Sequence, residues 1–406
     1  MSSSSVPRLA FWRDNAPWLL FGFGLTLGSS FGQTWYISLY AAEIRATFAL
    51  SHGEWGGLYT IATLASAALL IQAGRLADTM PLRWLATGLC LLFAGVCIAM
   101  SQVSSVAMLV VVIFGLRFCG QGMLSHVGMT AMGRWFVANR GRAVAFAGLG
   151  FAVGEAIFPA IAVRVAGEIG WREAWMVTAG ALALIFAPLC LLLLRQDRQP
   201  RSTRATGDES AGLLDRHWTR GEMLRHGLFW VLMPGIMAPP FISTAVFFHQ
   251  AHIVDLKGWD MVAYADAFPV FSFTAVLAAL VAGVVVDRVG ALRLLPFYLL
   301  PLAGGLLVLW QFTAAWSVFP YMGLMGVTAG LATTLLGAIW AELYGTRNLG
   351  GIRAIAAAGM VLSTALGPGI TGFGLDRGLG IESQAALLAA YLVAVSVFFA
   401  GLSRRL

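Results

Sequence analysis

Two charged side chains in the first half of this 406-residue sequence, Arg117 and Glu155, stand alone in long apolar segments. An unpaired charge at the middle of a membrane-spanning helix costs at least about 2.5 kcal/mol, so Arg117 must face protein or water. It can bind an anion or take part in proton coupling, or it can form a structural ion pair. Glu155 can exchange a proton, and Arg117 would sense that proton if the two side chains meet. The alternative is a permanently ionised pair without a functional role.

Other polar side chains near these two are candidate ligands. Gln121 follows Arg117 by four residues, which places both on one face of an α-helix and makes Gln121 a candidate substrate ligand. His126 follows by nine residues and points away, so we expect a packed or helix-bonding histidine. Gln33 and Tyr36 offer hydrogen-bonding groups and aromatic surface on the first apolar segment, and they are further candidates for substrate binding.

His249 is the remaining candidate, and it lies in an apolar stretch of the second half. Imidazole titrates near neutral pH, so His249 suits proton coupling, substrate binding or an outer gate, although it would equally suit a water-lined wall. Among the six histidines only His249 and His252 are close, and His-x-x-His without carboxylates is a poor metal site. We therefore expect neither an enzyme nor a metal or other cofactor. A phosphate-binding Gly-x-x-x-x-Gly-Lys-Ser/Thr loop is absent, which excludes ATP as a direct fuel.

The elements that must carry these side chains are membrane helices. Apolar residues make up 59% of the sequence and charged residues only 11%, whereas soluble domains are about 25% charged. The apolar runs reach the roughly 20 residues that an α-helix needs to cross a bilayer. The four cysteines lie inside these runs without paired spacing, so buried free thiols are expected. The predicted spans are 17–42, 54–77, 82–102, 106–131, 141–166, 172–195, 228–254, 262–286, 291–313, 316–342, 350–375 and 382–403.

Positive charge predicts the orientation of these twelve helices. With both termini in the cytoplasm, inside segments hold 20 of the 26 Lys and Arg residues, outside segments hold five, and Arg117 is in the membrane. The basic residues form no continuous patch, so a nucleic-acid partner is not expected. We expect a multi-pass protein of a cell inner (plasma) membrane that contacts the lipid bilayer and acts as a monomer.

The longest hydrophilic stretch divides the chain into equal halves. We expect a six-helix bundle over 1–195, a cytoplasmic linker over 196–227, and a second six-helix bundle over 228–406. The pattern Thr219-Arg-Gly-Glu222 predicts a capping box that opens a short amphipathic helix at the end of the linker.

The two halves also repeat in sequence. Gly74-Arg-Leu-Ala-Asp78 recurs as Gly283-Val-Val-Val-Asp287, and Pro159 recurs as Pro368, both at an offset of 209 residues. Two further landmarks lie between these pairs in the same order. Arg134-Trp-Phe matches Glu342-Leu-Tyr at an offset of 208 residues, and Arg142-Ala143 matches Arg353-Ala354 at 211. Because both copies run in the same sense, we expect two pseudo-symmetric bundles with a cavity between them.

The segment from Gly74 to Arg83 resembles the loop motif Gly-x-Leu-Ala-Asp-Arg-x-Gly-Arg-Arg of the major facilitator superfamily. Thr79 and Pro81 depart from that motif, whereas the second copy keeps Arg288 and Gly290. The resemblance implies twelve transmembrane helices in two bundles, with the first helix lining the cavity. Three further segments, Gly32–Tyr36, Arg117–Gly122 and Arg134–Ala143, resemble the monocarboxylate and oxalate/formate branch.

The resemblance also implies a gate on the cytoplasmic side. Asp78 should approach the start of helix 11 near Arg353, and Asp287 the start of helix 5 near Arg142, where a carboxylate meets free N–H groups. Arg83 and Arg288 belong to the same two loop motifs. The alternative is that these residues only mark topology.

The function that these features predict is secondary transport. We expect a small organic solute, of the carboxylate anion type, to cross the membrane by alternating access, coupled to protons or exchanged for a counter-ion. A proton-driven multidrug exporter of the same fold is the alternative, because Arg117 and Glu155 would serve it as well.

Overall fold

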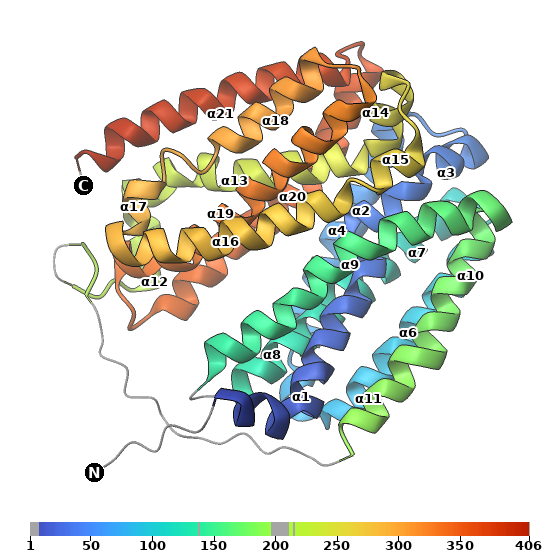
Figure 1. Ribbon diagram of the computed structural model, residues 1–406, viewed down its shortest axis with the longest axis horizontal. Coiled ribbons are helices and arrows are strands. Elements are labelled where there is room, and N and C mark those ends of the chain that lie inside the picture. The colour runs from blue at the N-terminus through green and yellow to red at the C-terminus, as the bar shows by residue number, and fades with distance from the viewer. Residues whose placement is uncertain (1–7, 137–138, 196–210, 214–215, 406) are drawn as a thin grey trace. The chain divides into compact units, whose positions relative to one another are not determined.

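The computed structural model describes residues 8–136, 139–195, 211–213 and 216–405, and every regular element among them is helical (Figure 1). Within this part of the chain, ten helices are long and apolar enough to cross a membrane. The predicted all-α membrane fold is therefore confirmed. The first predicted span is a helix with a break in it, and the ninth contains the shorter apolar helix Leu300–Gln311.

The chain forms two compact units, one of Met1–Ile37 with Ala62–Thr206 and one of Ser38–Ile61 with Gly207–Leu406. In the first unit α1 packs along α8 and α9, and α6 packs against α10 and α11. Its helices are α1 (Arg8–Gly28), η1 (Ser29–Gly32), α2 (Thr34–Ile37), the later part of α4 (His52–Ala73), α5 (Leu76–Thr79), α6 (Leu82–Ser101), α7 (Val106–Leu116), η3 (Arg117–Leu124), α8 (Ser125–Trp135), α9 (Arg140–Ile169), α10 (Trp171–Ala181), η4 (Leu182–Phe186) and α11 (Ala187–Leu193).

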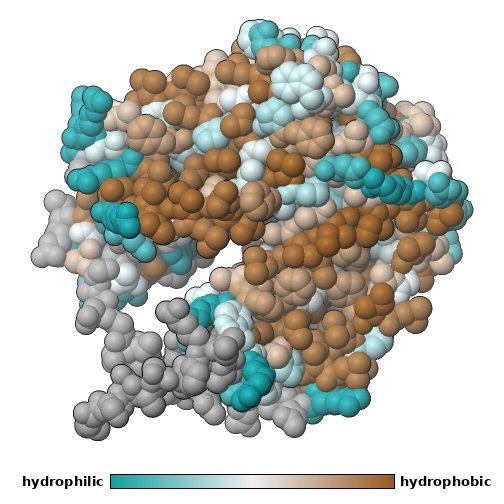
Figure 2. All heavy atoms as spheres, viewed as in Figure 1, coloured by the Kyte–Doolittle hydropathy of each residue, from teal (hydrophilic) through white to brown (hydrophobic). Residues whose placement is uncertain are grey.

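In the second unit α16 packs along α19, α13 along α20, and α18 along α21 (Figure 1). The face shown in Figure 2 is largely apolar over α16, as expected for helices that meet lipid. The helices are η2 (Ser38–Tyr40), α3 (Ala41–Phe48), the start of α4, α12 (Arg220–Arg225), α13 (Gly227–Phe248), α14 (Gln250–Lys257), α15 (Met261–Ala265), α16 (Phe268–Val289), α17 (Ala291–Leu294), α18 (Leu300–Gln311), η6 (Ala315–Ser317), α19 (Val318–Tyr344), α20 (Leu349–Asp376) and α21 (Ile381–Ser403).

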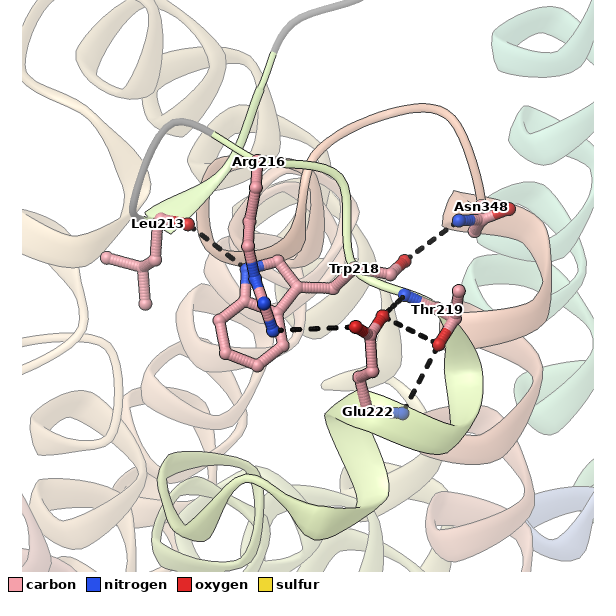
Figure 3. A network of polar contacts seen from close by, with 6 residues as sticks. All are labelled: Leu213, Arg216, Trp218, Thr219, Glu222 and Asn348. Atoms are coloured by element: carbon pink, nitrogen blue, oxygen red, sulfur yellow. Dashed lines mark hydrogen bonds and ion pairs between the residues drawn. The ribbon is translucent and has the colours of Figure 1, made fainter.

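The end of the predicted linker is anchored to the second unit. The predicted capping box is confirmed, since the Thr219 hydroxyl accepts from the Glu222 amide and the Glu222 carboxylate accepts from the Thr219 amide (Figure 3). The Asn348 side chain donates to the Trp218 carbonyl at 3.0 Å, and the Trp218 amide donates to the Tyr344 carbonyl at 3.1 Å. The segment before α12 is thereby tied to the turn between α19 and α20. The linker residues 196–210 and 214–215 lie outside the described residues.

The cysteine prediction is confirmed. Cys90, Cys97, Cys119 and Cys190 are buried and free of disulfide bonds.

Candidate functional site

The first span is interrupted in the first unit. Its helix α1 ends at Gly28, one 3₁₀ turn follows, and Gln33 takes an extended conformation with φ −77° and ψ 153° before α2 begins. An extended residue breaks the ladder of main-chain hydrogen bonds and leaves carbonyl groups without their helical donors. Such backbone is tolerated at membrane depth only where protein buries it or where it lines a cavity.

Arg117 supplies a donor for this break. Its guanidinium Nη1 donates to the Gly32 carbonyl at 3.0 Å, and only 2% of the residue surface is exposed. The segment that begins at Arg117, η3, is a π-helix, a geometry frequent at functional sites. It lies against η1 so closely that a Cβ atom on Gly32 would come within 2.7 Å of the Gly120 Cα atom. Glycine at both positions lets the two irregular segments touch backbone to backbone.

Glu155 approaches the break from α9. The preceding residue, Gly154, packs on η1, where a Cβ atom would meet the Ser30 hydroxyl at 2.0 Å. The indole of Trp35 lies beside the Glu155 carboxyl. Arg117 and Glu155 thus contact the same broken segment, one through Gly32 and the other through Trp35.

Three polar atoms of η1, η3 and the start of α8 have no hydrogen-bond partner among the described residues. The Ser30 hydroxyl, the Gln121 side-chain carbonyl and the Ser125 hydroxyl are buried and make no hydrogen bond with another described residue. Buried polar atoms are nearly always satisfied by protein, water or ligand. The two hydroxyl groups can donate to a small anion or to water, whereas the Gln121 carbonyl oxygen can only accept, for example from an ordered water.

The other predicted residues of this unit have structural contacts. The Tyr36 hydroxyl is 2.8 Å from the Thr178 hydroxyl, and the Tyr36 side chain is buried. His126 bonds the Gly74 carbonyl through Nε2 at 3.2 Å, which confirms the expected helix-bonding histidine. Gln33 is half-buried at the break itself.

His249 belongs to a second polar cluster, which lies in the second unit. Its Nε2 atom donates to the Pro368 carbonyl at 3.1 Å, because a carbonyl only accepts. The ring centroids of His249 and His52 are 5.8 Å apart, and those of His52 and His252 are 4.4 Å apart. Arg45 donates to His52 Nε2 at 3.1 Å, and since arginine cannot accept, His52 is neutral in this arrangement.

A carboxylate holds the start of α4 beside these histidines. Asp376, at the end of α20, accepts from the Ser51 hydroxyl at 2.7 Å, from the His52 amide at 3.1 Å and from the Gly53 amide at 2.8 Å. The free amides and positive dipole end of α4 favour this negative charge. The sequence pattern Ser51-x-x-Glu54 signals the helix start through its capping box, but nothing in the pattern indicates Asp376.

The predicted gating residues fall into two groups. Asp78 forms an ion pair of 3.0 Å with Arg134, which also donates to the Ala77 carbonyl, and Arg83 lies over the Trp84 ring. The residues Arg142, Asp287 and Arg288 are exposed and make no ion pair with another described residue.

Arg353 lines a cavity of about 480 Å³ in the second unit. The walls come from α13, α19 and α20, and most of them are apolar, including Pro240, Leu336 and Met360. The Ser243 and Thr333 side chains add hydroxyl groups.

Comparison with known proteins agrees with this architecture. A sequence profile described as the Major Facilitator Superfamily matches residues 22–270. No curated protein matches. Among solved structures, a bacterial homologue of the human lysosomal transporter Spinster in an inward-facing, unoccupied conformation is 16% identical, with a TM-score of 0.67 over 99% of this chain and 98% of that chain. The nucleoside transporter NupG is 12% identical, with a TM-score of 0.70 over 95% and 98%.

Proposed function

Because the chain belongs to the Major Facilitator Superfamily, we propose that it is a secondary active transporter of a small organic anion of the carboxylate type. The observation that carries this proposal is Arg117, a buried cation that donates to the Gly32 carbonyl at the break of the first span. A guanidinium can bind a carboxylate through two parallel hydrogen bonds. The resemblance to the monocarboxylate and oxalate/formate branch supports the same substrate class.

Glu155 is the proposed proton carrier. Arginine keeps its proton in proteins, so any titration at this site must occur on a neighbouring group. When Glu155 is ionised it offsets the charge of Arg117 and weakens anion binding. When Glu155 is protonated it no longer offsets the charge of Arg117, which then binds the anion, and proton and substrate move together. Exchange for a counter-ion would use the same site without net proton movement.

Two sets of contacts would close the transporter in turn. On the cytoplasmic side, Asp78 with Arg83 and Asp287 with Arg288 would engage the starts of helices 11 and 5, near Arg353 and Arg142. On the outer side, Asp376 holds the start of α4, and the rings of His52, His249 and His252 lie beside one another there, which supports an outer gate. Protonation of His52 would remove the acceptor that Arg45 uses and set two positive charges against each other, which favours opening.

We also propose how the two bundles are arranged in the membrane. Bundles at 1–195 and 228–406, joined by the 196–227 linker, would rock about the site as a monomer in a cell inner membrane. Both termini would face the cytoplasm, as the distribution of Arg and Lys indicates.

A proton-driven multidrug exporter is the second candidate. The observation that favours it is the largely apolar cavity beside Arg353, which suits an amphipathic drug better than a small carboxylate.

Reconstitution separates the two candidates. The purified chain would be screened by thermal shift against mono- and dicarboxylates and against cationic drugs, and the best ligand of each class would be tested in proteoliposomes. Uptake of a carboxylate driven by an imposed pH gradient, with no drug efflux, supports the proposal. Drug movement without carboxylate movement supports the exporter, and a chain that moves neither contradicts both.

A further inference from the structure

A groove on the outside of the second unit has no role in the proposed transport cycle. It has a volume of about 600 Å³ and lies between the start of the ninth span and the end of α21. Its principal lining residues are Arg293, Phe297, Leu300, Val397, Ala400 and Arg404.

The groove exists because the ninth span starts irregularly. Helix α17 stops at Leu294, and Pro296 cannot donate the main-chain hydrogen bond that would continue it. Turns then lead to α18, which begins at Leu300 and packs along α21. Helix α21 itself continues unbroken to Ser403, so one side of its last turns borders the irregular start of the ninth span.

The apolar side chains that line the groove are exposed. Val397 is 67% exposed and Phe297 is 60% exposed, while Leu300 and Val393 are close to 40%. From Val393 to Arg404 the helix rises about 16 Å, since each residue adds 1.5 Å. This length equals about half of the 30 Å hydrocarbon core, the depth of one leaflet.

The charges lie at one end of the groove. Arg293 in α17 and Arg404 just after α21 are exposed, and neither forms an ion pair with another described residue. No acidic side chain lines the groove. Figure 2 shows the apolar surface near α21 giving way to hydrophilic side chains close to the C-terminus labelled in Figure 1.

We propose that this groove binds one anionic phospholipid, with its phosphate between Arg293 and Arg404 and an acyl chain along Phe297, Leu300 and Val397. Two cations at headgroup level above an apolar channel one leaflet deep complement both parts of such a molecule. Basic pockets between transmembrane helices bind anionic headgroups by the same combination of forces. This inference is independent of the transported substrate.

The test counts lipids on the intact chain. The purified protein in detergent would be titrated with phosphatidylglycerol and, separately, with phosphatidylcholine, and bound lipid would be measured by native mass spectrometry. The Arg293→Gln/Arg404→Gln double variant should bind phosphatidylglycerol about 25-fold more weakly, because each arginine near an anionic headgroup contributes roughly fivefold. Phosphatidylcholine binding should change little.

Arg405 provides the matched control, since it is exposed at the same helix end and does not line the groove. Arg405→Gln should keep the parent affinity. An equal loss of phosphatidylglycerol binding in Arg405→Gln would overturn the proposal, because the basic end of α21 would then attract anionic lipid without a defined site. Binding equal to the parent in the double variant would also overturn it. Displacement of phosphatidylglycerol by inorganic phosphate would assign the arginines to a free anion. A second variant, Val397→Trp, fills the channel and should weaken phosphatidylglycerol binding with both arginines in place.

Discussion

The middles of the two units differ, although their sequences repeat. At the offset of 209 residues, Arg117 corresponds to Gly326 and Glu155 to Thr364, so the second unit carries neither charge. The backbones differ too. Gln33 interrupts the first span, whereas α13 runs unbroken through the corresponding residue, Ile242, in spite of its three prolines.

This difference shows that the fold needs neither the break nor the charges. The second unit builds an equivalent set of helices from apolar and small residues, with a continuous α19 at the position where the first unit has the π-helix η3. Features that cost stability in one copy and are missing from the other are best explained by function. We therefore propose that the chemistry of transport belongs to the first unit.

The largest expected effect follows from removing the cation of the first unit. Arg117→Gln should weaken carboxylate binding about 10- to 100-fold, because a hydrogen bond to a charged group contributes about 1.5–3 kcal/mol. Arg117→Lys keeps the charge but loses the paired geometry. Its carboxylate affinity should therefore lie between those of Arg117→Gln and the parent. Equilibrium binding to the purified protein measures both.

Arg353 provides a comparison in the second unit, where it lines a cavity of that unit. Arg353→Gln should alter the rate of transport more than substrate affinity. If Arg353→Gln lost as much carboxylate affinity as Arg117→Gln, both units would contribute to substrate binding. The proposed functional difference between the units would then be wrong.

A smaller effect should separate the two repeat loops. Asp78 is paired with Arg134 inside its own unit, whereas Asp287 has no ion pair with a described residue and remains available for a gate. Both Asp78→Asn and Asp287→Asn should increase access from the cytoplasm, with the larger increase for Asp287→Asn. The measurement is the labelling rate of a single cysteine at Ser243, which lines the cavity of the second unit. Labelling rates equal to the parent in both variants would rule out the gate.

The smallest effect concerns the anchored linker. The amide and hydroxyl of Thr219 lower the pKa of Glu222, since they bind its ionised form (Figure 3). A lowered folded-state pKa means that the cap stabilises α12 above the ordinary carboxyl pKa and is lost as pH falls through the lowered value. Glu222→Gln should thus speed amide hydrogen exchange in α12 at neutral pH. It should also abolish the loss of protection in α12 that the parent shows as the pH falls. If protection of α12 in Glu222→Gln fell with pH as it does in the parent, the cap would be excluded as the cause.

The sequence predicts the helices well and the contacts of its candidate residues less well. Long apolar runs and the asymmetry of positive charge are strong local signals, so the spans and the membrane class follow directly. The break at Gln33 leaves no such signal, because Ser29–Gly32 is as compatible with a helix as with a 3₁₀ turn. The tie between Asp376 and the start of α4 joins residues more than 320 positions apart, which a single sequence does not reveal.

The most direct test of the account is the transport of a carboxylate by Glu155→Gln in proteoliposomes. Glutamine resembles the protonated carboxyl, so Arg117 should still bind the anion while the exchangeable proton is gone. We predict that counterflow exchange of the carboxylate persists and that accumulation driven by a pH gradient disappears. Full pH-driven accumulation in Glu155→Gln would contradict the account and return the coupling role to His249.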